Sequence, residues 1–192
     1  MLPFDRRSSG DHSSRLAFAR ADVIVPEIPG GRSDLPLDIG AVPLAVFPVR
    51  ELKVGDAAPA LTPKAADGRP LDLQALRGRF VLLAFWATYR NLDDIPHLKA
   101  TYEAFGREPG LVMIGLSQDI EPDTARRYAT HRGLAWEQRY LGRSDADPVA
   151  AAFGMRHPPQ VILIGPDGRL VARDLQGDGI KQAVAKALGR KD

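Results

Sequence analysis

The chain of 192 residues contains no cysteine. This absence excludes disulfides, thiolate nucleophiles, iron–sulfur clusters and zinc sites built from thiolates. An excess of charge of one sign is also missing, because 26 Lys and Arg residues face 24 Asp and Glu residues and leave a formal net charge of +2. The basic residues form no run of five or more. Since nucleic-acid binding depends on a concentrated basic surface, we expect no nucleic-acid partner.

Long hydrophobic runs are missing too. The longest uninterrupted apolar stretch covers about residues 80–87, far short of the roughly 20 residues that span a bilayer. The first ten residues lack the apolar core and the small-residue cleavage site of a signal peptide. The sequence therefore predicts a soluble chain without a membrane span, cytoplasmic by default.

The composition is that of a globular protein, with 44% hydrophobic and 26% charged residues. Residues 1–14 are polar and residues 26–36 are rich in turn formers, so they are interpreted as a tail and a linker. The β-like stretches at 16–25 and 37–49 are too short for a core of their own. We interpret them as an extension of the main domain or as the end of a β-sandwich module. The sequence thus predicts two parts, residues 1–50 and residues 51–192.

From residue 51 onward, apolar strands alternate with amphipathic helices, the pattern of an α/β domain. The first strand follows an entry segment at 54–59 and a helical turn at 71–76. Strands are predicted at 80–86, 111–117, 136–140, 160–164 and 170–174. Helices are predicted at 93–105, 121–131, 147–154 and 179–188. The last two strands are joined by the turn Gly165-Pro166-Asp167-Gly168, which suits a tight antiparallel connection.

Three motifs in this order carry a family resemblance. They are V-G-D-A-A-P-A-L at 54–61, L-R-G-R-F-V-L-L-A-F-W-A-T at 76–88 and P-P-Q-V-I-L-I-G-P-D-G-R-L at 158–170. Over residues 52–189 the chain resembles the redoxin branch of the thioredoxin superfamily, which includes AhpC/TSA proteins and TlpA-like thiol-disulfide oxidoreductases. The resemblance implies a thioredoxin-like α/β fold, with a central mixed sheet flanked by helices.

The resemblance breaks at the redox loop. Family members continue W-A-T-W with C-x-x-C and later a helical proline, whereas this chain has Tyr89 at the second aromatic and Arg90 at the first cysteine. Asp93 or Asp94 falls near the second cysteine, and Pro96 arrives about two residues early. The loop is therefore shortened as well as changed. The resulting vestigial redox loop comprises Trp86, Tyr89, Arg90, Asn91, Asp93 and Asp94.

A proline loop remains at 157–160. By the resemblance, Pro159 matches the family's cis-proline, which presents backbone to an extended peptide, so we expect Pro159 to be cis. A peptide-binding groove would then involve Tyr89, Arg90, His157, Pro158 and Pro159. The same proline loop is also compatible with a purely structural role.

A metal or hydrolytic site is the other chemistry to weigh at this loop. The fold would bring His97 and His157 toward the segment that holds Asp93 and Asp94. The chain has no H-x-x-x-H or H-E-x-x-H spacing and no phosphate-binding glycine motif, so we expect no metal and no cofactor.

Simpler roles are expected for most of the loop residues. The two aspartates are predicted to cap the helix that follows and to complement its dipole, and Arg90 is predicted to pair with them. Trp86 is expected in the core, whereas Tyr89 is expected to lie exposed beside the loop.

These observations favour a redox-inactive thioredoxin-like domain that binds a protein or peptide at the vestigial loop, or that serves as a structural module. The alternative is a thiol-disulfide oxidoreductase or peroxiredoxin-like antioxidant that uses a thiol supplied from elsewhere. A third interpretation is that the chain is a truncated product of a longer gene, in which case an exported location of its relatives would apply to the parent protein.

Overall fold

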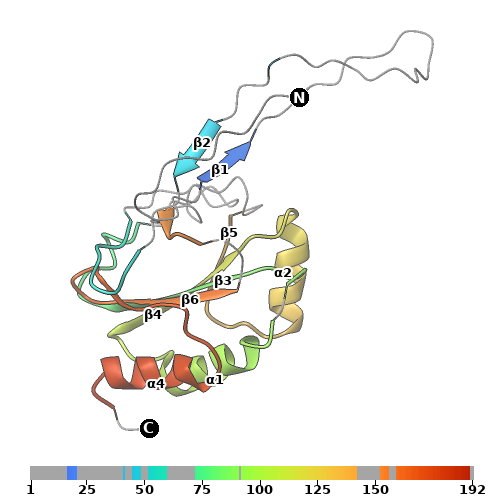
Figure 1. Cartoon of the computed structure of the whole chain (residues 1–192). Helices are drawn as coiled ribbons and strands as arrows, with labels where there is room; N and C mark the ends of the chain where they lie inside the picture. Colours follow the sequence, from blue (N-terminus) through green and yellow to red (C-terminus); the bar gives the residue numbers. More distant parts are fainter. Residues whose placement is uncertain are drawn as a thin grey trace. The chain divides into compact units, whose positions relative to one another are not determined.

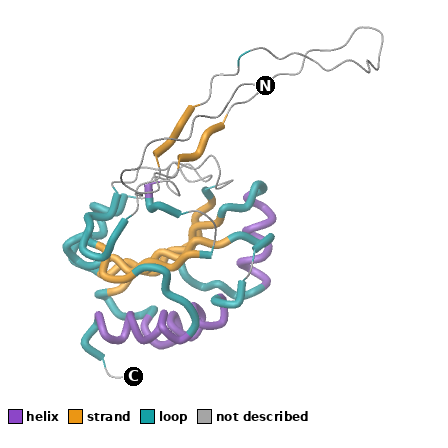
Figure 2. Tube along the Cα trace, viewed as in Figure 1, coloured by secondary structure: helices purple, strands orange, loops and turns teal. Residues whose placement is uncertain are grey.

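The computed structural model divides the chain into two compact units, residues 1–49 and 50–192. It describes residues 17–20, 41, 45–48, 52–59, 72–90, 92–141, 152–155 and 159–190, which Figure 2 colours by secondary structure. No helix among these residues is both long enough and apolar enough to cross a bilayer.

The first unit contains one antiparallel strand pair. β1 (Ala17–Arg20) pairs with β2 (Ala45–Pro48), and Pro48 lies opposite Ala17 at the end of the ladder. Both strands of a two-stranded sheet are edge strands, and an edge position tolerates the missing N–H of proline. The strands fall within the two β-like stretches expected from the sequence.

The second unit is built on a five-stranded sheet in the order β5-β4-β3-β6-β7. The strands are β3 (Phe80–Trp86), β4 (Leu111–Ser117), β5 (Glu137–Tyr140), β6 (Gln160–Ile164) and β7 (Leu170–Ala172). The pairs β3–β4 and β4–β5 are parallel, whereas β6 runs antiparallel to β3 and to β7. The mixed sheet expected of a thioredoxin-like fold is confirmed.

Helices α1 (Ile95–Phe105) and α4 (Asp178–Ala187) pack against each other along one face of the sheet (Figure 1). Helix α2 (Pro122–His131) connects β4 to β5 and contributes to the same apolar cluster. The helix expected at 93–105 begins two residues later, at Ile95. Most of the helix expected at 147–154 lies outside the described residues.

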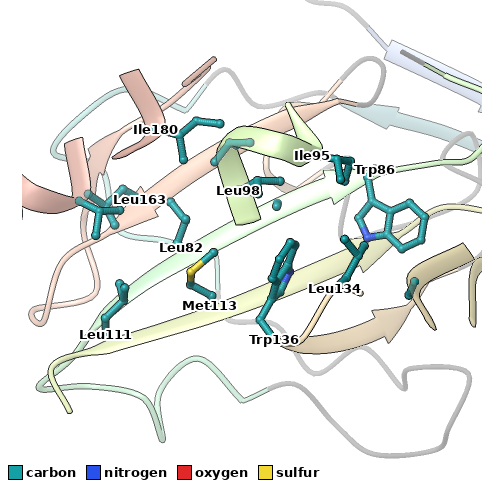
Figure 3. Close-up of a cluster of buried hydrophobic side chains, with 14 of the residues drawn as sticks. Leu82, Trp86, Ile95, Leu98, Leu111, Met113, Leu134, Trp136, Leu163 and Ile180 are labelled. Carbon is teal, nitrogen blue, oxygen red and sulfur yellow. The ribbon is translucent and has the colours of Figure 1, made fainter. Parts of the chain in front are cut away.

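Both faces of the central strands are buried. In β3, Leu82 and Trp86 point toward the helices, whereas Leu83 and Phe85 belong to the cluster on the opposite face. Burial on both faces explains why β3 and β4 are continuous apolar runs instead of alternating patterns. Figure 3 shows the helix-side cluster, where Ile95 and Leu98 of α1 meet the sheet. This packing fixes the place where β3 passes into α1.

Candidate functional site

The loop between β3 and α1 lies at the edge of the sheet where β3 and β4 end and β6 begins. β3 and β4 are parallel and in register to their ends, with Trp86 opposite Ser117, so both carboxyl ends reach the same edge. The backbone N–H of Gln118 donates to the carbonyl of Trp86 at 2.9 Å. On the other side of β3, Phe85 lies opposite Gln160, the first residue of β6. We call residues 87–90, 92–94, 118–120 and 159–160 the site face, because ligands of α/β sheets bind outside the carboxyl ends of the strands.

Buried polar side chains concentrate at this edge. Of the five buried polar or charged residues in the described part of the chain, four lie here, namely Ser117, Gln118, Asp119 and Gln160. The side-chain amide of Gln118 is fully buried, and neither its nitrogen nor its oxygen has a hydrogen-bond partner among the described residues. Because an unsatisfied buried polar group costs stability, the Gln118 amide makes this edge a candidate site.

The carboxylate of Asp119 ties the loop to the end of β4. Asp119 is only 4% exposed. Its Oδ1 accepts hydrogen bonds from the backbone N–H of Thr88, at 2.9 Å, and from the Thr88 hydroxyl. Its Oδ2 accepts from the hydroxyl of Ser117 at 2.8 Å, and its own N–H donates back to that oxygen. A charged acceptor that satisfies several donors makes strong hydrogen bonds, so the first turn of the loop is held firmly.

The surface above this network is aromatic and apolar. Tyr89 is 52% exposed, and its hydroxyl donates to the carbonyl of Gln118 at 3.3 Å. The guanidinium of Arg90 lies 5.6 Å from the centre of the Tyr89 ring, a cation–π arrangement. Ile120, two residues beyond Gln118, is 60% exposed. Trp86 is buried in the core as expected, and its indole N–H donates to Gln138 Oε1 at 3.2 Å.

The predicted helix cap by Asp94 is wrong. Asp94 is the residue at the N-cap of α1, but it makes no side-chain hydrogen bond to that helix. Its backbone is already helical, at φ −78° and ψ −12°, and this conformation turns the carboxylate away from the N–H groups that an extended cap would reach. Instead, Oδ1 accepts from the N–H of Gly177 at 2.8 Å. Asp94 thus links the loop to the start of α4. Asp93 is exposed in the preceding turn.

His97 also faces α4 in the structure. Its Nδ1 lies 3.0 Å from Oδ1 of Asp178, the first residue of α4. His97 and Asp94 thus both contact the start of α4, and their grouping with His157, which lies outside the described residues, stays a prediction. No group of three His, Cys, Asp or Glu side chains suited to a metal occurs in the part of the chain that the structure describes.

Three of the sequence-predicted site residues, Asn91, His157 and Pro158, lie outside the described residues. Pro159 is half-buried directly before β6. Its cis conformation stays a prediction. Gln160, which follows it, donates from Nε2 to Asp174 Oδ1 at 2.7 Å. Asp174 is the single non-glycine residue in the described chain with a positive φ, at 54°.

The residues that hold the loop after β3 against the sheet were not predicted from the sequence. Asp119 and its neighbours Ser117 and Gln118 form a polar triplet directly after the buried apolar run of β4. A polar triplet at that position is a usable signal, because the carboxyl ends of parallel strands gather at one edge. The pairing of Asp119 with Thr88, 31 residues earlier, has no local signature.

Replacing Asp94 with alanine is expected to lower the free energy of unfolding by about 1–2 kcal/mol, because the Gly177 N–H loses a charged acceptor. Urea denaturation measures the change. Glu103→Ala, which removes an exposed carboxylate from α1, is the control and is expected to stay within about 0.5 kcal/mol. Equal effects of the two substitutions would contradict the role assigned to Asp94.

The sheet is mixed, and its central strand β3 passes through a loop into helix α1. The antiparallel strand β6, which Pro159 precedes, lies beside β3. This arrangement defines a thioredoxin-like domain. The model of the AhpC/TSA family matches residues 54–173, and the chain belongs to this family.

Its relatives are thiol-disulfide proteins by name. A protein named thiol-disulfide oxidoreductase ResA, from Bacillus anthracis, is 23% identical over 123 residues, which are 63% of this chain and 69% of that protein. The thioredoxin domain of a thiol-disulfide oxidoreductase from Bacteroides vulgatus is 29% identical, with a TM-score of 0.63 over 71% of this chain and 98% of that domain. A thiol:disulfide interchange protein from Bacteroides sp. is also 29% identical, with a TM-score of 0.63 over 73% of this chain and 94% of that chain.

Proposed function

We propose that this thioredoxin-like domain binds an extended protein segment at the site face and does not itself catalyse thiol-disulfide exchange. The proposal depends on the loop between β3 and α1, which occupies the position of the family's redox loop. Hydrogen bonds of Asp119 to Thr88 and of Asp94 to Gly177 hold this loop, although the chain has no cysteine. Exchange requires a thiolate that attacks a disulfide sulfur, and no other side chain replaces it. The function that remains for the site face is therefore binding.

The exposed side chains of the site face suit protein recognition. Tyr89 and Ile120 are two of the four large hydrophobic residues that the described part of the chain exposes strongly, and both belong to this face. Aromatic side chains and arginine are enriched at binding interfaces, and Arg90 lies against the Tyr89 ring. The Asp119 bonds to Thr88 and the Tyr89 bond to Gln118 hold Thr88 and Tyr89 against the end of β4, which lowers the entropy that these two residues lose on binding.

A second candidate function is oxidoreductase activity that uses a thiol supplied by another molecule. It is favoured by membership in the AhpC/TSA family and by relatives named thiol-disulfide oxidoreductases. In this case the site face would still hold the substrate, while the sulfur chemistry would take place on the second molecule.

The binding proposal is tested with reduced, carboxymethylated α-lactalbumin, an unfolded protein with blocked thiols. Backbone amide NMR shifts of the domain are expected to saturate at 87–90, 92–94, 118–120 and 160 as the probe is added. Tyr89→Ala is expected to weaken binding about tenfold, because an exposed aromatic anchor is lost. Val54→Ala is the control, since Val54 is also exposed but lies on the segment that pairs with β7.

Shifts spread over the surface, or equal losses in the two variants, would contradict binding at the site face. Reduction of insulin by dithiothreitol is measured in parallel with the native chain. Acceleration by the native chain alone would contradict the absence of catalysis, whereas acceleration only with an added thiol protein would favour the second candidate function.

A further inference from the structure

A groove away from the sheet edge runs between α1 and the connection from α2 to β5. It consists of two hollows of about 520 and 470 Å³, and Lys99 and Glu103 line both of them. Each hollow is within the 300–1,000 Å³ typical of small-molecule sites. The first is also lined by Tyr102, Arg107 and Trp136, so it lies along the carboxyl-terminal half of α1.

The floor of the first hollow is aromatic. The rings of Tyr102 and Trp136 lie with their centres 5.7 Å apart at an angle of 48°. Figure 3 shows Trp136 among the side chains of the helix-side cluster. Tyr102 is half-buried whereas Trp136 is buried, so the Tyr102 ring supplies most of the aromatic surface that a flat apolar ligand can contact.

The indole N–H of Trp136 has no acceptor among the described residues. Trp136 is 6% exposed, and its nitrogen is among the buried side-chain atoms without a hydrogen-bond partner. A buried indole normally donates its N–H, as Trp86 does to Gln138. The unsatisfied donor in the wall of the hollow therefore calls for an acceptor from outside this part of the chain.

The rim of the groove is mostly cationic. Lys99, Arg107 and Arg132 line it, and Glu103 is the one carboxylate among the described lining residues. Lys99 donates to the carbonyl of Arg132 at 3.0 Å, which uses one of the three donors of an ammonium group. Arg107 is exposed, and no ion pair joins it to another described residue. The charge of the rim is complementary to an anion.

We propose that the first hollow binds a small organic anion with a flat apolar body, such as an aromatic carboxylate. The apolar body packs on Tyr102 beside Trp136, and the carboxylate pairs with Arg107 at the end of the hollow beyond Glu103. The Trp136 ring turns slightly so that its N–H, covered in the empty groove, donates to the ligand. This site is independent of the binding proposed at the site face.

The test uses 2-naphthoate as the probe and the two tryptophan indoles as reporters. The chain contains only Trp86 and Trp136, so an ¹H–¹⁵N spectrum shows two indole cross-peaks, assigned with Trp136→Phe. The Trp136 cross-peak is expected to shift saturably as naphthoate is added, while that of Trp86 stays in place. Neutral 2-naphthamide, which has the same ring system, is expected to bind about fivefold more weakly, and 0.5 M NaCl is expected to reduce this difference.

Arg107→Gln is expected to weaken naphthoate binding about threefold to fivefold, whereas Lys181→Gln, an exposed position on α4 outside the groove, is expected to leave it unchanged. The absence of a saturable Trp136 shift up to 5 mM naphthoate would overturn the proposal. Equal affinities for naphthoate and naphthamide would overturn the anion site, and a Trp136 shift that depends on protein concentration alone would assign the groove to a second copy of the chain. Shifts confined to the site face would also overturn it, without affecting the proposed function.

Discussion

Replacing Asp119 with alanine is expected to lower the free energy of unfolding by about 2–4 kcal/mol and to release the loop after β3 from the sheet. The substitution removes the acceptor of three hydrogen bonds, from the N–H and hydroxyl of Thr88 and from the hydroxyl of Ser117. Since these donors are buried or partly buried, they are left without a partner, and an unsatisfied donor costs about 1–3 kcal/mol. Urea denaturation monitored by tryptophan fluorescence measures the loss.

Two further variants separate the carboxylate from its partners. Asp119→Asn keeps one acceptor oxygen of the same shape, so less than half of the loss is expected. Thr88→Val removes the hydroxyl but keeps the N–H bond, and a loss of about 1 kcal/mol is expected. Amide exchange at Thr88 and Tyr89 is expected to quicken in Asp119→Ala while β3 stays protected. A stability change below about 0.5 kcal/mol in Asp119→Ala would contradict the bracing role.

The elements of the second unit could be predicted because their signals are local. The apolar runs of β3 and β4 and the turn between β6 and β7 lie where the sequence pattern places them. Pro122 in the first turn of α2 and Gly133 just beyond its end, at φ 62°, mark that helix correctly. Each of these features depends on neighbours within a few residues.

The contacts of the site could not be predicted in this way. The carboxylate of Asp94 bonds Gly177, 83 residues away, and His97 contacts Asp178, 81 residues away. Asp119 reaches back to Thr88 across the parallel strand pair. An aspartate at the position of Asp94 is normally expected to cap the helix that follows. The helical backbone angles of Asp94 exclude such a cap, and no residue pattern reveals those angles.

Introducing two thiols is expected to give this cysteine-free chain thiol-dependent insulin reduction. Arg90→Cys combined with Asp93→Cys gives a C-x-x-C spacing directly after Tyr89. In the structure, however, α1 begins only at Ile95, so neither position lies in the first turn of the helix. A helix N-terminus stabilises a thiolate only at close range, within its first turn. We therefore expect the double variant to reduce insulin only slowly in the presence of dithiothreitol.

An insertion variant tests whether the length of the loop between β3 and α1 limits the rate. Inserting Ala-Ala after position 93 in the same double variant supplies two strong helix formers, so that α1 can begin at the second thiol. A thiol with an ordinary pKa of about 8.5 is a few per cent ionised at neutral pH, whereas one with a pKa near 7 is about half ionised. The rate of insulin reduction is then expected to rise about tenfold over the double variant.

The native chain and a Ser-for-Cys version of the insertion variant serve as controls, because they contain the same loop lengths without thiols. Thermal unfolding confirms that each variant is folded before rates are compared. If the insertion brings no increase while both thiol variants fold, loop length does not limit the rate of insulin reduction, and other surroundings of the thiols, such as the Asp94 bond to Gly177, must be changed as well. If the double variant alone is already fast, the helix start observed at Ile95 does not limit the chemistry, and substitution of the cysteines was the decisive change.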